Sequence, residues 1–240
     1  GDASDTPAAA CAARLTAALS SLCRLGLDHL ALSLPAKTLS SGERLRVQTA
    51  RFLLAQVAET LFVLDEPSRV LHQADLHLLS AALRELVDRG NTVVVAEQSG
   101  LAGIASADWL IELGASPDGK RSVCFSGNAA SWPRPDTAAD TEVLCKRKLK
   151  PAKRLMHGLC ISLDASRFPE QKIKLPLRSV VAVCGRSGAG KTRLLSETLL
   201  GGFRRYQQGR EAALKSGGAG WGSIRRAVYL GQISFSRRRL

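Results

Sequence analysis

The chain has 240 residues, of which 45% are apolar, so it can bury one large core or two modest ones and is neither a disordered nor a fibrous protein. Its 34 Lys and Arg residues outnumber its 21 Asp and Glu residues, and the excess is uneven, since residues 1–127 have a net charge of about −3 and residues 128–240 of about +16. The basic half favours a polyanionic partner such as nucleic acid, with an ordinary solvated face as the alternative.

Two helices are predicted ahead of the first strand. Residues 11–30 carry apolar side chains at approximately helical spacing, and Gly26 is expected to end this helix. A second helix is expected to open at residues 39–43, LSSGE. Ser40 or Ser41 suits its N-cap, and Glu43 falls in its first turn, where a negative charge is favourable.

Strands and helices then alternate. Residues 61–64 (LFVL) form a short apolar run that ends in Asp-Glu-Pro, and residues 92–96 (TVVVA) form a second run that ends in Glu-Gln. A helix is predicted between them at residues 76–87, and a closing pair of strands at residues 109–113 and 122–125. This alternation predicts an α/β fold in which helices cover a parallel sheet.

The second half begins with a change in composition. Residues 128–155 contain prolines, small polar residues and a basic run, and we interpret them as a linker, either a solvated tether or a strap that contacts DNA. Residues 173–177 alternate as a strand does, and residues 179–184 (SVVAVC) predict a buried strand. A helix is expected at residues 193–200 and a last strand at residues 227–230.

A glycine-rich loop, GRSGAGKT, matches the pattern G-x-x-x-x-G-K-[ST] between a predicted strand and a predicted helix. Glycines let backbone N–H groups wrap a polyphosphate, and the helix N-terminus adds partial positive charge. The lysine can reach the outer phosphates and the threonine hydroxyl can ligate Mg²⁺. The sequence therefore predicts a nucleotide site, against the minor alternative of a plain strand-to-helix turn. Its residues are Gly185, Arg186, Ser187, Gly188, Ala189, Gly190, Lys191 and Thr192.

Two carboxylates follow the apolar run at residues 61–64. Beside a phosphate-binding loop, Asp65 can hold Mg²⁺ and Glu66 can polarise an attacking water. Taken alone, the same two residues could be solvated groups at the end of a strand. The glycine-rich loop and the LSSGE sequence favour the chemical interpretation.

The cysteines and the hydropathy limit which metal sites, disulfides and cellular locations are expected. Six cysteines are scattered with no C-x-x-C pair, which argues against a zinc site and against a disulfide framework. No run is as long as a membrane span, and the N-terminus lacks the pattern of a signal peptide. We therefore expect a cytoplasmic protein with reduced thiols and no membrane partner. Because the chain begins at Gly1, we also expect it to be incomplete.

In combination, these motifs resemble the ABC ATPase superfamily and, within it, the UvrA family of ATPases that recognise DNA damage in bacterial nucleotide excision repair. The resemblance rests on LSSGE at residues 39–43, LDEPS at residues 64–68, GNTVVV at residues 90–95, the glycine-rich loop and the glutamine at position 232. It covers almost everything from about Leu22 onward except the linker.

The resemblance implies a set of roles. In that family two ABC modules lie in tandem and sandwich two ATP molecules, and the signature motif of one module caps the γ-phosphate held by the other. ATP and Mg²⁺ are implied as cofactors, with damaged double-stranded DNA and excision repair proteins as partners and a homodimer of the full-length protein. The implied residues are Ser40, Ser41, Gly42 and Glu43 in the signature, Asp65 as Mg²⁺ ligand, Glu66 as catalytic base, Gln98 as switch residue and Gln232 as sensor of Mg²⁺ and water.

The order of the motifs leaves two arrangements open. In the tandem arrangement, residues 1–127 are the back half of a first ABC module, residues 128–155 the linker and residues 156–240 the front half of a second module. The signature would then face Lys191 across a shared nucleotide, and the chain would hold no complete hydrolytic site. In a permuted arrangement, Asp65 and Lys191 would share one sheet and one site.

Departures from the family pattern leave hydrolysis open. Ser41 stands where glycine is usual, Gln98 stands where histidine is usual and cannot carry charge, and Arg69 with Val70 replaces a usual Ile-Gly. Three functions therefore remain as hypotheses. They are ATP-dependent damage recognition, UvrA-like protection of DNA from an intercalating drug, and ATP binding as structural glue without turnover.

Overall fold

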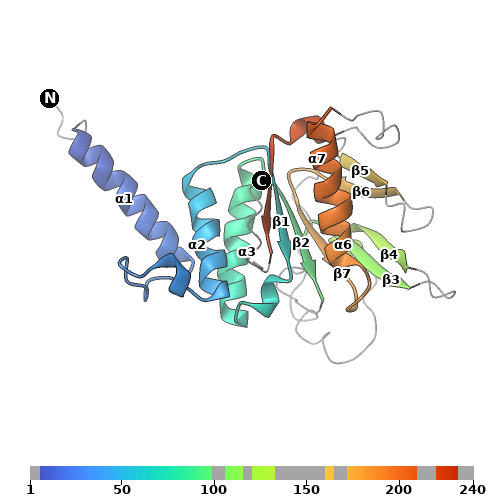
Figure 1. Cartoon of the computed structure of the whole chain (residues 1–240), viewed down its shortest axis with the longest axis horizontal. Coiled ribbons are helices and arrows are strands. Elements are labelled where there is room, and N and C mark those ends of the chain that lie inside the picture. The colour runs from blue at the N-terminus through green and yellow to red at the C-terminus, as the bar shows by residue number, and fades with distance from the viewer. Residues whose placement is uncertain are drawn as a thin grey trace.

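A six-stranded, mainly parallel sheet forms the centre of the molecule (Figure 1). Its strands are β1 (Thr60–Asp65), β2 (Thr92–Glu97), β3 (Trp109–Ala115), β4 (Arg121–Asn128), β7 (Val180–Cys184) and β8 (Arg226–Leu230). They lie in the order β4-β3-β7-β2-β1-β8, and all neighbours are parallel except the closing pair β3 and β4. The structure, a computed structural model, describes residues 6–98, 106–115, 121–132, 160–164, 172–209 and 220–231.

The two halves of the sequence interleave in this sheet. Strand β7, from the second half, lies between β2 and β3, with Val181 opposite Val94 on one side and opposite Trp109 on the other. Strand β8, also from the second half, pairs with β1, where Ala227 lies opposite Leu61. The phosphate-binding loop and the Asp-Glu motif therefore follow strands of the same sheet, a feature that the permuted arrangement predicts.

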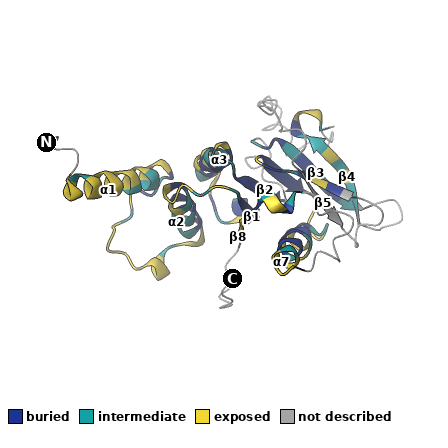
Figure 2. Ribbon diagram, turned by 90° about the horizontal axis from the view of Figure 1, so that it is seen from above, coloured by how far each residue is buried: buried dark blue, intermediate teal, exposed yellow. Residues whose placement is uncertain are grey.

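Helices cover both faces of the sheet (Figures 1 and 2). On one face lie α2 (Ser41–Leu54) and α3 (Gln73–Asp88). On the other lies a helical segment made of α6 (Lys191–Arg193), a π-helical stretch (Leu194–Leu200) and α7 (Gly201–Gln207). The predicted α/β fold, with a phosphate-binding loop between a strand and a helix, is thus confirmed.

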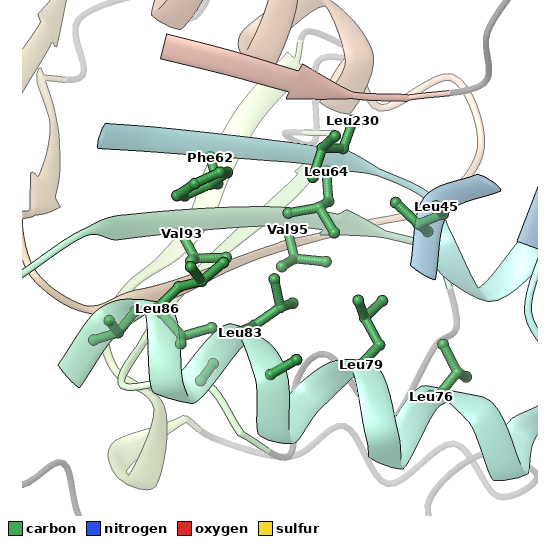
Figure 3. Packing of buried hydrophobic residues seen from close by; sticks show 14 of the residues in the cluster. Leu45, Phe62, Leu64, Leu76, Leu79, Leu83, Leu86, Val93, Val95 and Leu230 are labelled. Carbon is green, nitrogen blue, oxygen red and sulfur yellow. The ribbon is translucent and has the colours of Figure 1, made fainter. Parts of the chain in front are cut away.

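The central strands alternate between two cores. On β1, Phe62 and Leu64 point to the side of α3, whose leucines pack against them (Figure 3). Leu61 and Val63 point to the opposite side, towards the helical segment that starts at Lys191. Because both faces of these strands are buried, their sequences are continuous apolar runs and show no polar alternation. This is why short runs such as LFVL and TVVVA could be predicted as strands.

Helix α1 (Pro7–Arg24) extends away from the sheet and has no buried residue (Figure 2). Thr6 caps its start, and Gly26, with a φ of 69°, follows its end as predicted. Just beyond the helix, Leu25 and Leu27 are buried beside α2 and α3. The chain is therefore anchored at the end of α1, while the helix itself remains exposed.

A hairpin of β5 (Cys160–Asp164) and β6 (Lys172–Pro176) forms a separate two-stranded sheet. The alternation of residues 173–177 predicts β6, whereas the sequence does not single out β5. Of the predicted linker, residues 128–132 are described, with a 3₁₀ turn at Ala129–Ser131, and the rest lies outside the described residues. Within the described ranges, none of the helices combines the length and the apolar character needed to cross a bilayer.

Candidate functional site

Three glycines shape the loop that follows β7. Gly185, Gly188 and Gly190 have φ angles of 147°, 80° and 101°, a region that favours glycine. A Cβ on Gly185 would lie 2.3 Å from the carbonyl oxygen of Leu113, so the loop closes directly against β3. The loop can therefore bring its backbone N–H groups close to a ligand, which is the cradle that a phosphate group requires.

Lys191 opens the helix after this loop and is 4% exposed. Its ammonium group donates hydrogen bonds to the carbonyl oxygens of Gly185 (2.8 Å) and Arg186 (3.2 Å). Its Nζ atom also lies 3.8 Å from Oε1 of Glu66. The P-loop lysine and the predicted catalytic base are thus in contact within one site, where residues far apart in the sequence meet.

Glu66 follows the last residue of β1 in a left-handed backbone conformation, with φ 49° and ψ 54°. Such a conformation costs a residue other than glycine about 1–3 kcal/mol, so the surroundings must hold it. The Glu66 N–H donates to the carbonyl oxygen of Ala96 on β2 at 2.9 Å, and Oε2 forms an ion pair with Arg69 at 2.9 Å. The backbone bond and the two cations together aim the carboxylate towards the loop.

Asp65 presents one satisfied and one unsatisfied oxygen. The hydroxyl of Tyr229, on β8, donates to Oδ2 at 3.1 Å, while Oδ1 is buried without a hydrogen-bond partner among the described residues. Burial raises the pKa of the Tyr229 hydroxyl, and the charge of Asp65 raises it further, so this hydroxyl stays protonated and donates. The unsatisfied oxygen is available to a cation.

A magnesium ion fits here only together with a phosphate. The described residues contain no cluster of three or more His, Cys, Asp or Glu side chains that could hold a metal ion alone. Mg²⁺ is commonly bound by one or two carboxylates plus substrate phosphates and water. Asp65 offers a free oxygen and Thr192 is exposed at the start of the helix, so both match that mode of binding.

Glu97, at the end of β2, lies next to the site, and the motifs of the sequence do not single it out. It is 1% exposed and accepts hydrogen bonds from the Ser68 backbone N–H (3.0 Å) and from the Ser68 hydroxyl. Burial raises the pKa of its carboxyl, and the neighbouring charge of Glu66 adds to that rise, whereas the bonds from Ser68 oppose it. Its place directly after an apolar run was a usable signal in the sequence, but the sequence alone shows neither its burial nor its contact with Ser68.

The two predicted glutamines follow the ends of β2 and β8. Gln98 directly follows β2 and is exposed. Gln232 lies outside the described residues, one position beyond Gly231.

The signature residues form a helix start. Ser40 caps α2 in a reciprocal capping box, in which the Glu43 N–H donates to the Ser40 hydroxyl (3.2 Å) and the Ser40 N–H donates to Glu43 Oε2 (2.7 Å). Hydrogen bonding from Ser40 lowers the pKa of Glu43. Gly42 is buried, and a Cβ there would lie 2.4 Å from the Val70 carbonyl oxygen. The start of α2 is therefore packed against the loop that follows β1.

The signature residues and Lys191 have different partners in this structure. The Ser40 hydroxyl accepts a hydrogen bond from the Glu43 N–H, whereas Lys191 contacts Glu66. Ser41 is exposed and lines a pocket between α2 and the ends of β1 and β8. The other residues that line it are Arg44, Leu45, Gln48, Asp65, Pro67, Val70, Leu230 and Gly231. The signature thus adjoins Asp65 in the same copy, because α2 precedes β1 and packs on it.

The chain is similar to UvrABC system protein A. It is 33% identical to that protein from Malacoplasma penetrans over 195 residues, which are 78% of this chain and 20% of the relative. It is 36% identical to that from Bacillus subtilis over 188 residues, 75% of this chain and again 20% of the relative. The crystal structure of UvrA2 from Deinococcus radiodurans is 34% identical, covers 58% of this chain and 17% of its own, and has a TM-score of 0.46.

No protein-family model matches the sequence. The curated relatives match it across about three quarters of its residues, while the chain spans about one fifth of their length. The similarity therefore assigns the chain to the UvrA family as a partial member.

Proposed function

We propose that this chain is the ATP-binding part of a UvrA-like ABC ATPase that recognises DNA damage during nucleotide excision repair. The observation that carries the proposal is the 3.8 Å contact between Lys191 of the glycine-rich loop and Glu66 of the Asp-Glu motif, which follow β7 and β1 of one sheet. The relatives are named as components of the UvrABC system, which supports a role in the same process.

The residues suggest how the site works. A triphosphate in the loop takes the place of Gly185, Arg186 and Glu66 as the partner of Lys191, whose charge then stabilises the outer phosphates. Asp65 and Thr192 would hold Mg²⁺, which neutralises phosphate charge when bound. Once released from Lys191, Glu66 orients and deprotonates a water molecule. Gln98 is proposed as the switch residue beside the terminal phosphate, and Gln232 is proposed to sense Mg²⁺ and the attacking water.

The relation to the longer relatives is also a proposal. Residues 1–127 and 156–240 correspond, as we propose, to the back of a first ABC module and the front of a second, joined by a linker at residues 128–155. Within this chain the two halves complement each other, because β7 and β8 occupy the sheet positions beside β2 and β1. Damaged DNA, excision repair proteins, a homodimer and a cytoplasmic location belong to this same proposal.

A second candidate function is ATP binding without turnover. Both carboxylates that hydrolysis needs are held by side chains of the chain itself, Asp65 by Tyr229 and Glu66 by Arg69. If the bound nucleotide does not release them, ATP would stabilise the fold without being cleaved. Measurement of phosphate release by the wild type and by Glu66→Gln separates the two. Turnover that falls at least about 100-fold in the variant, with binding kept, supports hydrolysis.

Substitution of Lys191 by alanine tests nucleotide binding. We expect isothermal titration with ATP and Mg²⁺ to show an affinity at least about 100-fold weaker, because a charged contact to the outer phosphates is lost. Lys174→Ala, at an exposed lysine on β6, is the matched control and should bind as the wild type does. Equal affinity of Lys191→Ala and the wild type would remove the proposal.

A further inference from the structure

Arg69 stands in the short turn that directly follows the Asp-Glu motif. A 3₁₀ turn (Pro67–Arg69) begins after Glu66, and its middle residue, Ser68, is fastened to the buried Glu97 through both its backbone N–H and its hydroxyl. Glu97 ends β2, the strand that separates β1 from β7. The backbone of Arg69 is therefore fixed beside the phosphate-binding loop, while its side chain is 62% exposed and free to change partners.

Glu66 joins Arg69 to the P-loop lysine. Arg69 Nη1 lies 2.9 Å from Glu66 Oε2, and Lys191 Nζ lies 3.8 Å from Oε1 of the same carboxylate. Since the two oxygens of a carboxylate are about 2.2 Å apart, the two cationic groups are separated by no more than about 9 Å. Two cations that contact different oxygens of one phosphate can lie up to about 8 Å apart. The Glu66 carboxylate thus lies between Arg69 and Lys191, and one phosphate group could contact both of these cations in its place.

Charge balance indicates what happens when a polyphosphate enters. A terminal phosphate carries more negative charge than Glu66 and offers three oxygens, so it competes with this carboxylate for both cations. Arginine suits such a group because its planar fork can donate two hydrogen bonds to it. A nucleoside diphosphate in the same loop ends one phosphate earlier and leaves Arg69 on Glu66.

We propose, resting on the proposed nucleotide site, that Arg69 is a second phosphate-binding cation of this chain and distinguishes a nucleoside triphosphate from a diphosphate. On arrival of the terminal phosphate, Arg69 exchanges Glu66 for that phosphate. The same exchange frees Glu66, so recognition of the triphosphate and release of the carboxylate are one event.

The test compares two nucleotides in three proteins. A non-hydrolysable ATP analogue and ADP, each with Mg²⁺, are titrated into the wild type, Arg69→Gln and Arg225→Gln. The control, Arg225, is 82% exposed and pairs with Glu59 away from the loop, so it matches Arg69 as an exposed Arg–Glu pair. We expect Arg69→Gln to bind the triphosphate analogue about tenfold more weakly while its ADP affinity stays within about twofold of the wild type. Arg225→Gln should change neither, and Arg69→Lys should recover part of the loss.

Each other outcome contradicts the inference in a distinct way. Equal affinities of Arg69→Gln and the wild type for the triphosphate analogue overturn it. Tighter binding by Arg69→Gln also overturns it and identifies the ion pair as a latch that only restrains Glu66. An equal loss of affinity for the triphosphate analogue and for ADP also overturns it, and shows that Arg69 supports the structure of the site without contacting the terminal phosphate. Absence of nucleotide binding by the wild type contradicts the proposed function and, with it, this inference.

Discussion

Gly185 of the phosphate-binding loop is tightly surrounded, whereas Gly188 is not. Its φ is 147°, and a Cβ would lie 2.3 Å from a backbone carbonyl oxygen of β3, which cannot move as a flexible side chain can. We expect Gly185→Ala to lower the free energy of unfolding by about 2–4 kcal/mol and to abolish nucleotide binding. Gly188 also has a positive φ, 80°, but no atom lies within 4 Å of its added Cβ, so Gly188→Ala should cost only about 1 kcal/mol. Urea unfolding and nucleotide titration of the two variants check this, and equal losses would refute it.

The pKa values of Glu97 and Glu43 are shifted in opposite directions, which predicts that their contributions to stability depend on pH in opposite ways. The pKa of Glu97 is raised in the folded state, so its contribution to stability is present below the ordinary value of 4.5 and is lost as the pH rises through its raised pKa. The pKa of Glu43 is lowered, so its contribution is present above 4.5 and is lost as the pH falls through its lowered pKa.

Glutamine variants of both residues test this. The free energy of unfolding is measured by urea unfolding from about pH 3 to about pH 8. The wild type should lose stability as the pH rises through the raised pKa of Glu97, and Glu97→Gln should not show this loss. The wild type should also lose stability as the pH falls through the lowered pKa of Glu43, and Glu43→Gln should not show that loss. A Glu97→Gln profile parallel to that of the wild type would show that burial of this carboxyl does not oppose its ionisation.

At the scale of elements, Arg46 on α2 forms hydrogen bonds to the end of α1 and to α3. It is 7% exposed on α2 and donates to the carbonyl oxygens of Leu25 (3.0 Å) and Gly26 (3.2 Å), just after α1, and to Asp75 Oδ1 (3.0 Å) on α3. We expect Arg46→Leu to lower the free energy of unfolding by about 2–4 kcal/mol, because two carbonyls and one carboxylate lose their donor.

The same substitution should release α1. Hydrogen exchange of the α1 amides should become faster in Arg46→Leu, whereas Arg51→Leu, at an exposed position of the same helix, should change neither exchange nor stability by more than about 0.5 kcal/mol. Unchanged exchange in α1 after loss of Arg46 would show that this helix is held without Arg46, by the burial of Leu25 and Leu27 and by the Arg24–Glu85 ion pair.

Elements were predictable where the signal was local. The capping box of α2 could be predicted because Ser40 and Glu43 have the required spacing, and the buried strands because both their faces are apolar. The glycine-rich loop was predictable because its pattern fixes both ends of a strand-to-helix turn. The left-handed backbone of Glu66 and its contacts with Arg69 and Lys191 were not, since they depend on pairing between residues far apart in the chain.

At the scale of the molecule, strand order decides what the chain can do. Placement of β7 beside β2 brings Lys191 to Glu66, and placement of β8 beside β1 brings Tyr229 to Asp65. Motif order along the sequence allowed a tandem or a permuted arrangement, because it does not state which strands pair. Long-range pairing in this sheet therefore creates a site that no stretch of the sequence contains by itself.

The most direct test is a search for nuclear Overhauser effects between β2 and β7 in solution. Adjacent parallel strands place backbone protons of facing residues within range, and Val94 lies opposite Val181 and Val95 opposite Ala182. A site formed within one chain predicts such contacts between these pairs, and their persistence when labelled protein is diluted with unlabelled protein. If both strands are ordered but show no mutual contacts, or show them only between differently labelled copies, Lys191 and Glu66 do not share one site in this chain.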